Sequence, residues 1–208
     1  MENIHFNKED FEVFSIKGLE ERMVGIREHI QPKFRHFAGE ATALLKEELG
    51  GVSLPVHVAK HLRRTKYAPD NTWCAIGGDT RGYKKYPHFQ IAISGDGVAF
   101  YLCLIDQPLK EKEMAKRLLA NIPLLGTLPD DFVVSVDHTV ADVMRIAETD
   151  WPLALARLRD VKKAELMIGT KIQHDDLRLN SEKGTETLMK DTFMQLLPIY
   201  KLCIAEYE

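Results

Sequence analysis

Residues 88–105 read HFQIAISGDGVAFYLCLI, and this stretch decides the expected fold. Apolar side chains at positions 89, 91 and 93 alternate with smaller or polar ones, which is typical of a strand with one buried face. Gly95-Asp96-Gly97 is a tight-turn signal. The residues after it are apolar on both faces, as in a central strand. We therefore predict an antiparallel hairpin of two strands, His88–Ser94 and Val98–Ile105.

More strands and helices are predicted on both sides of this hairpin. Short β-rich segments lie at 53–59, 72–76, 132–136 and 164–168. Asn7 is a good N-cap for an opening helix at 6–14. Helical patterns follow at 19–30 and 34–49, interrupted by Pro32, then at 109–122, in two short helices of which the second starts at Asp150-Trp151-Pro152, and at 181–205, with a kink at Pro198. The predicted fold is α+β: a single domain over residues 1–208, with a mainly antiparallel sheet packed against the N- and C-terminal helices.

The composition is that of an ordinary globular protein. The chain has 208 residues, of which 45% are hydrophobic and 28% charged. No apolar run approaches the roughly 18 to 20 residues of a membrane span, and the N-terminus has no apolar segment of a secretory signal. Cys74, Cys103 and Cys203 lie far apart, which favours buried reduced thiols over disulfides or a thiolate metal site. We expect a cytoplasmic protein without membrane contact, and the sequence indicates neither a cofactor nor an oligomeric state.

Positive charge is concentrated in one part of the chain. Residues 57–88 hold seven Lys and Arg against two Asp, a net charge of +5 in a chain whose net charge is −3. Three of the eight histidines, His57, His61 and His88, fall in the same window. Such a local excess predicts an anion-binding surface.

The first cluster in this window comprises His57, Lys60, His61, Arg63 and Arg64. The two imidazoles would share a face either in a strand or, four residues apart, in a helix. The helical zinc motif also requires a Glu after its first His, where this chain has Val, so the pair does not predict a metal site. The alternatives are a solvated strand end or an anion site made by the Lys and Arg side chains.

The second cluster runs from Arg81 through Tyr83 and Lys84 to His88. Arg offers a planar fork to phosphate or carboxylate, and Lys offers a mobile charge. Tyr83 could stack on bases, as aromatic side chains do in single-strand binders. Trp73, between the clusters, fits either a core anchor or a stacking platform. The alternative for the second cluster is a solvated charged loop.

The third group is Asp137-His138-Thr139, at the end of the predicted strand 132–136. A His beside an Asp suggests a general base. Adjacent strand residues face opposite ways, however, so Asp137 would not orient His138 directly. Helix capping by Asp137 or Thr139 is the alternative. Glu165, after Lys162-Lys163, is predicted to be a surface or edge-strand acid, and the sequence has neither a nucleophile elbow nor a phosphate-binding glycine loop.

Taken together and in this order, several polar motifs resemble the YktB-like family of bacterial proteins of unknown function. The resemblance implies a single α+β domain. It implies no substrate, cofactor or catalytic residue. The motifs that carry it are His57-Val58-Ala59-Lys60-His61, Arg63-Arg64, Thr72-Trp73, Arg81-Gly82-Tyr83-Lys84, Pro87-His88-Phe89-Gln90, Asp137-His138-Thr139 and Lys162-Lys163-Ala164-Glu165.

Three functions remain open at this point. The first is binding of, or action on, a phosphate-bearing ligand such as a nucleotide or nucleic acid by the basic, His-rich face, with Trp73 or Tyr83 stacking. The second is a hydrolase, with or without a divalent metal. Its candidate catalytic residues are His57, His61, His88, Asp137 and His138. The third is a protein-interaction module for an acidic partner.

Overall fold

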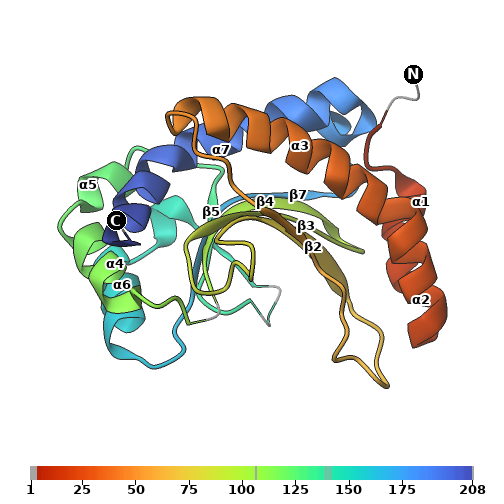
Figure 1. Cartoon of the computed structure of the whole chain (residues 1–208), viewed down its shortest axis with the longest axis horizontal. Coiled ribbons are helices and arrows are strands. Elements are labelled where there is room, and N and C mark those ends of the chain that lie inside the picture. The colour runs from red at the N-terminus through yellow and green to blue at the C-terminus, as the bar shows by residue number, and fades with distance from the viewer. Residues whose placement is uncertain (1–3, 106, 139, 141, 208) are drawn as a thin grey trace. The chain divides into compact units, whose positions relative to one another are not determined.

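The structure is a computed structural model, and it describes residues 4–105, 107–138, 140 and 142–207 (Figure 1). It contains a seven-stranded sheet with the order β1-β2-β3-β4-β7-β5-β6. The pairs β1–β2, β5–β6 and β5–β7 are antiparallel, which confirms the predicted α+β class. The strands are β1 (Val56–Val58), β2 (Asn71–Gly77), β3 (His88–Ser94), β4 (Gly97–Leu104), β5 (Val133–Ser135), β6 (Met144–Arg145) and β7 (Leu166–Gln173).

The chain divides into two compact units, and several strands contribute residues to both. The first unit comprises the residues up to Ile76, with Gln90–Phe100 and Lys171–Asp191. The second comprises Gly77–Phe89, Tyr101–Thr170 and the residues from Thr192 onward. The single domain over residues 1–208 stays a prediction.

Helices α1 (Lys8–Glu12), α2 (Leu19–Gly25) and α3 (Gln31–Glu48) belong to the first unit. Asn7 caps α1 as predicted: its side chain accepts from the Asp10 backbone N–H, and the Asp10 carboxylate accepts from the Asn7 N–H. The Asp10 side chain is fully buried and forms an ion pair with Lys33 of α3. This pair ties the opening helix to the longest helix of the unit.

The predicted interruption at Pro32 is wrong. The chain stays helical from α2 through a π-helical segment, Ile26–Ile30, into α3. Pro32 is the second residue of α3 and directly follows the π-helical segment, so the continuous helix accommodates a residue that has no N–H to donate.

The second unit contains α4 (Glu111–Leu119), α5 (Ile122–Leu125), α6 (Trp151–Asp160) and the later part of α7 (Glu182–Ile204). Figure 1 shows α4, α5 and α6 gathered beside the C-terminal end of α7. In the core of this unit the centre of the Phe89 ring lies 4.8 Å from the centre of the Phe193 ring and 4.9 Å from the centre of the Tyr200 ring.

The predicted hairpin at 88–105 is present as β3 and β4, which are neighbours in the sheet. Gly97 begins β4 at a point of close approach, because a Cβ there would lie 1.9 Å from the carbonyl oxygen of Ile172 in β7. β7 is longer than the predicted 164–168 and runs through Gly169 to Gln173. Two short helices are predicted after the helix at 109–122, the second of them starting at Asp150. The first is wrong, since β6 and a 3-10 turn at Ile146–Glu148 stand in its place.

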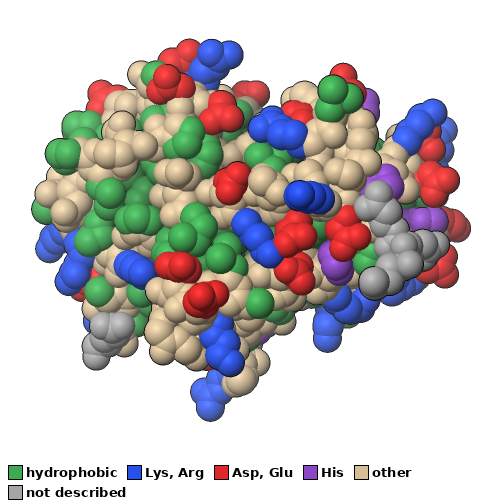
Figure 2. Space-filling view, turned by 90° about the horizontal axis from the view of Figure 1, so that it is seen from above, with side chains coloured by type: hydrophobic (Ala, Val, Ile, Leu, Met, Phe, Trp, Pro, Cys, Tyr) green, Lys and Arg blue, Asp and Glu red, His purple; other side chains and the backbone are tan. Residues whose placement is uncertain are grey.

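Two further sequence predictions concern side chains. The three cysteines are buried as predicted, and burial raises the pKa of Cys74 and Cys203 to about 12. On the face drawn in Figure 2, Lys and Arg are interspersed with Asp and Glu, so this face does not carry a one-sided positive charge.

Within the described residues, no helix is long and apolar enough to cross a membrane. The cytoplasmic location stays a prediction.

Candidate functional site: a histidine–carboxylate cluster

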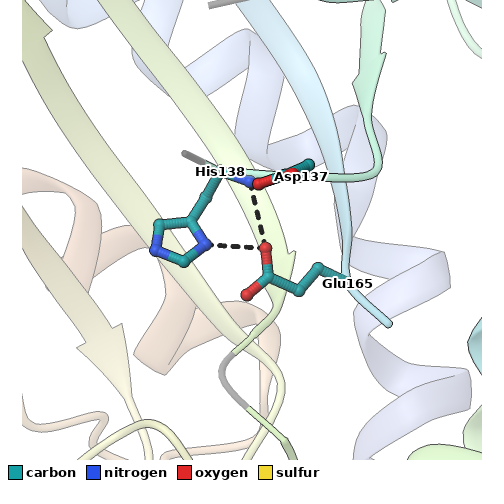
Figure 3. Close-up of side chains that lie close together, drawn as sticks. All are labelled: Asp137, His138 and Glu165. Carbon is teal, nitrogen blue, oxygen red and sulfur yellow. Dashed lines mark hydrogen bonds and ion pairs between the residues drawn. The ribbon is translucent and has the colours of Figure 1, made fainter. Parts of the chain in front are cut away.

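Asp137, His138 and Glu165 form a histidine–carboxylate cluster in the second unit (Figure 3). Each residue offers one ligand atom, an imidazole nitrogen or a carboxylate oxygen, and these atoms all lie within 4.8 Å of one another. Asp137 and His138 follow β5, whereas Glu165 immediately precedes β7. The cluster therefore joins residues that are far apart in the sequence.

Strand register explains why these residues meet. β5 and β7 are antiparallel neighbours, with Val133 opposite Gly169 and Ser135 opposite Met167. Asp137 and His138 follow the end of β5 and Glu165 precedes the start of β7, so the pairing of these two strands brings together the segments that carry them.

His138 is held by Glu165 through two hydrogen bonds to one oxygen. Oε2 of Glu165 accepts from the backbone N–H of His138 at 3.0 Å and from Nδ1 at 2.6 Å. Figure 3 shows the other ring nitrogen, Nε2, pointing away from Glu165. The His138 side chain is 43% exposed and that of Glu165 only 11%, so a mostly buried carboxylate orients a solvent-accessible imidazole.

The strand end that carries His138 is braced from two sides. The buried hydroxyl of Ser135 donates to the carbonyl oxygen of Asp137 at 3.0 Å. Arg157 of α6 donates to the carbonyl oxygen of Val136 at 3.2 Å. These bonds hold the backbone from which the cluster's side chains extend.

Glu111, the first residue of α4, adds another carboxyl near this cluster. Burial raises the pKa of Glu111, Lys112 opposes the rise and the charge of Glu165 adds to it. Its Oε1 atom is buried and has no hydrogen-bond partner among the described residues. A buried carboxyl oxygen without a partner is costly in a structural site.

This arrangement permits two kinds of chemistry. Imidazole and carboxylate groups are ligands for Mn²⁺, Zn²⁺ and related divalent ions. Alternatively, a carboxylate on Nδ1 fixes the tautomer that leaves Nε2 to act as a general base. Both kinds use His138 and Glu165.

The sequence predicted two of the three residues, Asp137 and His138, as candidates, and the prediction that Glu165 is a surface or edge-strand acid is wrong. Glu165 is neither a surface nor an edge acid, because β7 lies between β4 and β5 and the side chain is mostly buried. The sequence predicted that Asp137 would not orient the imidazole of His138 directly, and the imidazole is instead held by Glu165. The missed signal was the pairing of the two predicted strands 132–136 and 164–168. Thr139, the alternative capping residue, lies outside the described residues.

Apart from His57, which lies in β1, the first basic cluster lies on the loop between β1 and β2, which we call the basic hairpin loop (Ala59–Asp70). Figure 1 shows it in orange, extending beyond the strands. The expected alignment of His57 and His61 is wrong, because β1 ends at Val58 and His61 adopts a turn conformation with φ of 51°. Nε2 of His61 instead lies 3.0 Å from Oγ1 of Thr72, and its ring packs edge-on against Trp73. Lys60, Arg63 and Arg64 are exposed on this loop.

The second basic cluster lies in the second unit, on the loop between β2 and β3. Asp79 organises this loop, because its carboxylate accepts from the backbone N–H groups of Arg81 (2.7 Å) and Gly82 (3.1 Å) and from the Tyr86 hydroxyl (3.1 Å). Arg81 and Lys84 are exposed, whereas His88 is fully buried against the ring of Tyr83. The predicted basic face is thus divided between the two units.

Comparisons with known proteins find one matching family and a set of similar bacterial proteins. A family described as "Domain of unknown function (DUF1054)" matches residues 6–200. The chain is 46% identical over 202 residues to a UPF0637 protein of Enterococcus faecalis, covering 97% of this chain and 98% of that protein. The identity is 41% over 197 residues to a UPF0637 protein of Exiguobacterium sibiricum (95% and 97% covered) and 38% over 199 residues to one of Listeria monocytogenes (96% and 97% covered).

The chain therefore belongs to the DUF1054 (UPF0637) family. The resemblance to bacterial proteins of unknown function is confirmed, and the family description names no activity.

Proposed function

We propose that this protein binds a divalent metal ion at the histidine–carboxylate cluster and uses it to hydrolyse a phosphate-bearing substrate. The observation that carries the proposal is the convergence of His138, Asp137 and Glu165, with ligand atoms within 4.8 Å of one another. One imidazole and two carboxylates are suitable ligands for Mn²⁺ or Zn²⁺, whereas soft metal ions prefer thiolate and thioether ligands.

The exposure of the cluster favours a catalytic rather than a structural ion. Structural zinc sites are closed by four protein ligands, whereas catalytic sites keep a position for water or substrate. Three protein donors, one of them on a partly exposed imidazole, leave such a position. A divalent ion there would act as a Lewis acid and activate water.

A phosphate-bearing substrate is proposed because cations flank the cluster in the sequence. Lys162 and Lys163 are exposed on the turn that leads into Glu165. Lys163 has a φ of 65°, a conformation that L-residues rarely adopt outside tight turns. A nucleotide or a nucleic acid would meet both the cations and the metal ligands, and anion binding is part of this proposal.

The test measures metal content and hydrolysis together. Purified protein is analysed for bound metals, titrated calorimetrically with Mn²⁺ and Zn²⁺, and assayed with p-nitrophenyl phosphate and bis(p-nitrophenyl) phosphate. We expect stoichiometric binding that His138→Ala and Glu165→Gln abolish. Asp131→Asn, at an exposed acid of the same unit outside the cluster, is the matched control. Equal metal binding by His138→Ala and the parent protein would overturn the proposal.

The short bond between Nδ1 of His138 and Glu165 favours a second candidate, general-base catalysis without a metal. In this case activity would survive chelation and would still be lost in His138→Ala. His138→Ala would lower the rate by roughly 10²- to 10⁴-fold, the usual contribution of a positioned base, and Glu165→Gln would lower it because the imidazole loses the carboxylate that orients it. Activity in EDTA therefore separates the two candidates.

A further inference from the structure

The basic hairpin loop carries positive charge that nothing in the described structure neutralises. Lys60, Arg63, Arg64 and Lys66 are exposed, and within the described parts of the chain none of them forms an ion pair. The acid in the loop, Asp70, is already paired with Arg22 of α2 at 3.2 Å. Four cations on one short loop therefore attract anions.

Two large apolar side chains on the same loop are also exposed. Leu62 is 84% exposed and Tyr67 is 69% exposed. The ammonium group of Lys66 lies 5.2 Å from the centre of the Tyr67 ring. This contact places a cation over an exposed aromatic ring, and cations combined with aromatic rings bind a base and its phosphate.

Hydrogen bonds at the tip and at the base fix the conformation of the basic hairpin loop. The Arg64 N–H donates to the carbonyl oxygen of His61 at 2.9 Å and closes a turn at the tip. At the base, the Ala59 N–H donates to the Trp73 carbonyl at 2.9 Å, and Arg22 donates to the Pro69 carbonyl at 3.0 Å. A preorganised loop loses less conformational entropy when it binds.

We propose that the basic hairpin loop binds a single strand of nucleic acid, with Lys60, Arg63 and Arg64 on the phosphates and Tyr67 stacked on a base. A single strand fits better than a duplex because its unstacked bases can reach the tyrosine ring. It also fits better than an anionic membrane, since Leu62 is the one aliphatic side chain of the loop's tip that is strongly exposed among the described residues. This binding function does not depend on the histidine–carboxylate cluster.

The experiment measures fluorescence anisotropy of labelled oligo(U) and oligo(dT), each about 20 nucleotides long, at about 50 and 200 mM salt. We expect Arg63→Gln/Arg64→Gln to weaken binding by about tenfold or more and to reduce the salt slope by about 1.4, at about 0.7 per lost phosphate contact. Tyr67→Ala should weaken binding by about fivefold or more through lost stacking. Lys17→Gln/Lys46→Gln, at exposed lysines of the same unit, is the matched control.

Circular dichroism and melting temperature establish that each variant is folded, which is expected because all the changed side chains are exposed. Unchanged binding in both the arginine and the tyrosine variants would overturn the proposal. Tighter binding to a duplex, to phosphatidylserine vesicles or to a poly-glutamate peptide than to the single strand would also overturn it. Strand binding is read by anisotropy and metal binding by calorimetry, so the failure of the loop to bind a strand and the failure of the cluster to bind metal are separate results.

Discussion

The histidine–carboxylate cluster and the basic hairpin loop are built in opposite ways. The cluster joins residues from two strand ends, and the register between β5 and β7 decides its geometry. The loop is one continuous segment whose charge can be counted in the sequence. A site made across strands depends on the sheet, whereas a site made along one loop depends on local turns and on where the loop is anchored.

The largest expected effect concerns the cluster. His138→Ala and Glu165→Gln should each weaken Mn²⁺ binding by about 100-fold or more, since even groups behind the metal ligands contribute roughly 10- to 100-fold. Arg63→Gln/Arg64→Gln should change Mn²⁺ affinity by less than about twofold because neither side chain belongs to the cluster. Isothermal titration calorimetry measures both, and a similar loss in all variants would break the contrast between the two regions.

The next effect tests whether the first unit can be weakened without affecting the cluster. Asp10→Ala removes the carboxylate that accepts from the backbone N–H of the N-cap residue Asn7, and it leaves Lys33, whose side chain is 17% exposed, without its ion-pair partner. We expect a loss of about 2 to 4 kcal/mol in the free energy of unfolding. Urea denaturation measures this loss. The Mn²⁺ affinity of the folded variant should stay unchanged, and a parallel loss of affinity would show that the cluster depends on the opening helix.

A smaller effect on strand binding is expected when a contact behind the tip of the basic hairpin loop is removed. Thr72→Val removes the hydroxyl that lies 3.0 Å from Nε2 of His61, behind the hairpin tip. Burial, with a contribution from the charge of Arg64, lowers the pKa of His61, so the imidazole is neutral near pH 7. We expect strand affinity to fall by about threefold through looser positioning of the tip. Anisotropy measures the change, and a loss as large as that of the arginine variants would contradict it.

The smallest expected effect is a pH dependence in the second basic loop. The backbone N–H of Arg81 holds the pKa of Asp79 below its usual value; burial opposes this, and the hydroxyl of Tyr86 lowers the pKa further. A carboxyl group with a lowered folded-state pKa stabilises the fold above its unfolded pKa of about 4, and this stabilisation is lost as pH falls through the folded value. Asp79→Asn should therefore be less stable than the parent protein near pH 7, and the gap should narrow in acid. Urea denaturation of both proteins near pH 7 and in acid measures the difference in their free energies of unfolding. A difference that does not change with pH would contradict the lowered pKa of Asp79.

Much of the fold could be predicted because its signals are local. Alternation and the Gly95-Asp96-Gly97 turn located β3 and β4, and Asn7 marked the start of a helix. Pro32 misled the prediction because a π-helical segment before it keeps the chain helical. Gly169 misled it because extended backbone in a central strand tolerates glycine, so β7 continues past it.

The amino-acid sequence by itself determined the α+β class, the hairpin at its centre and the concentration of Lys and Arg in residues 57–88. These follow from periodicity, turn residues and charge, which are properties of neighbouring positions. Only the tertiary structure decided that Glu165 holds His138, that His88 is buried and that the basic residues fall in two separate units. Strand order and register set these relations, and they depend on which distant segments pair rather than on any one segment.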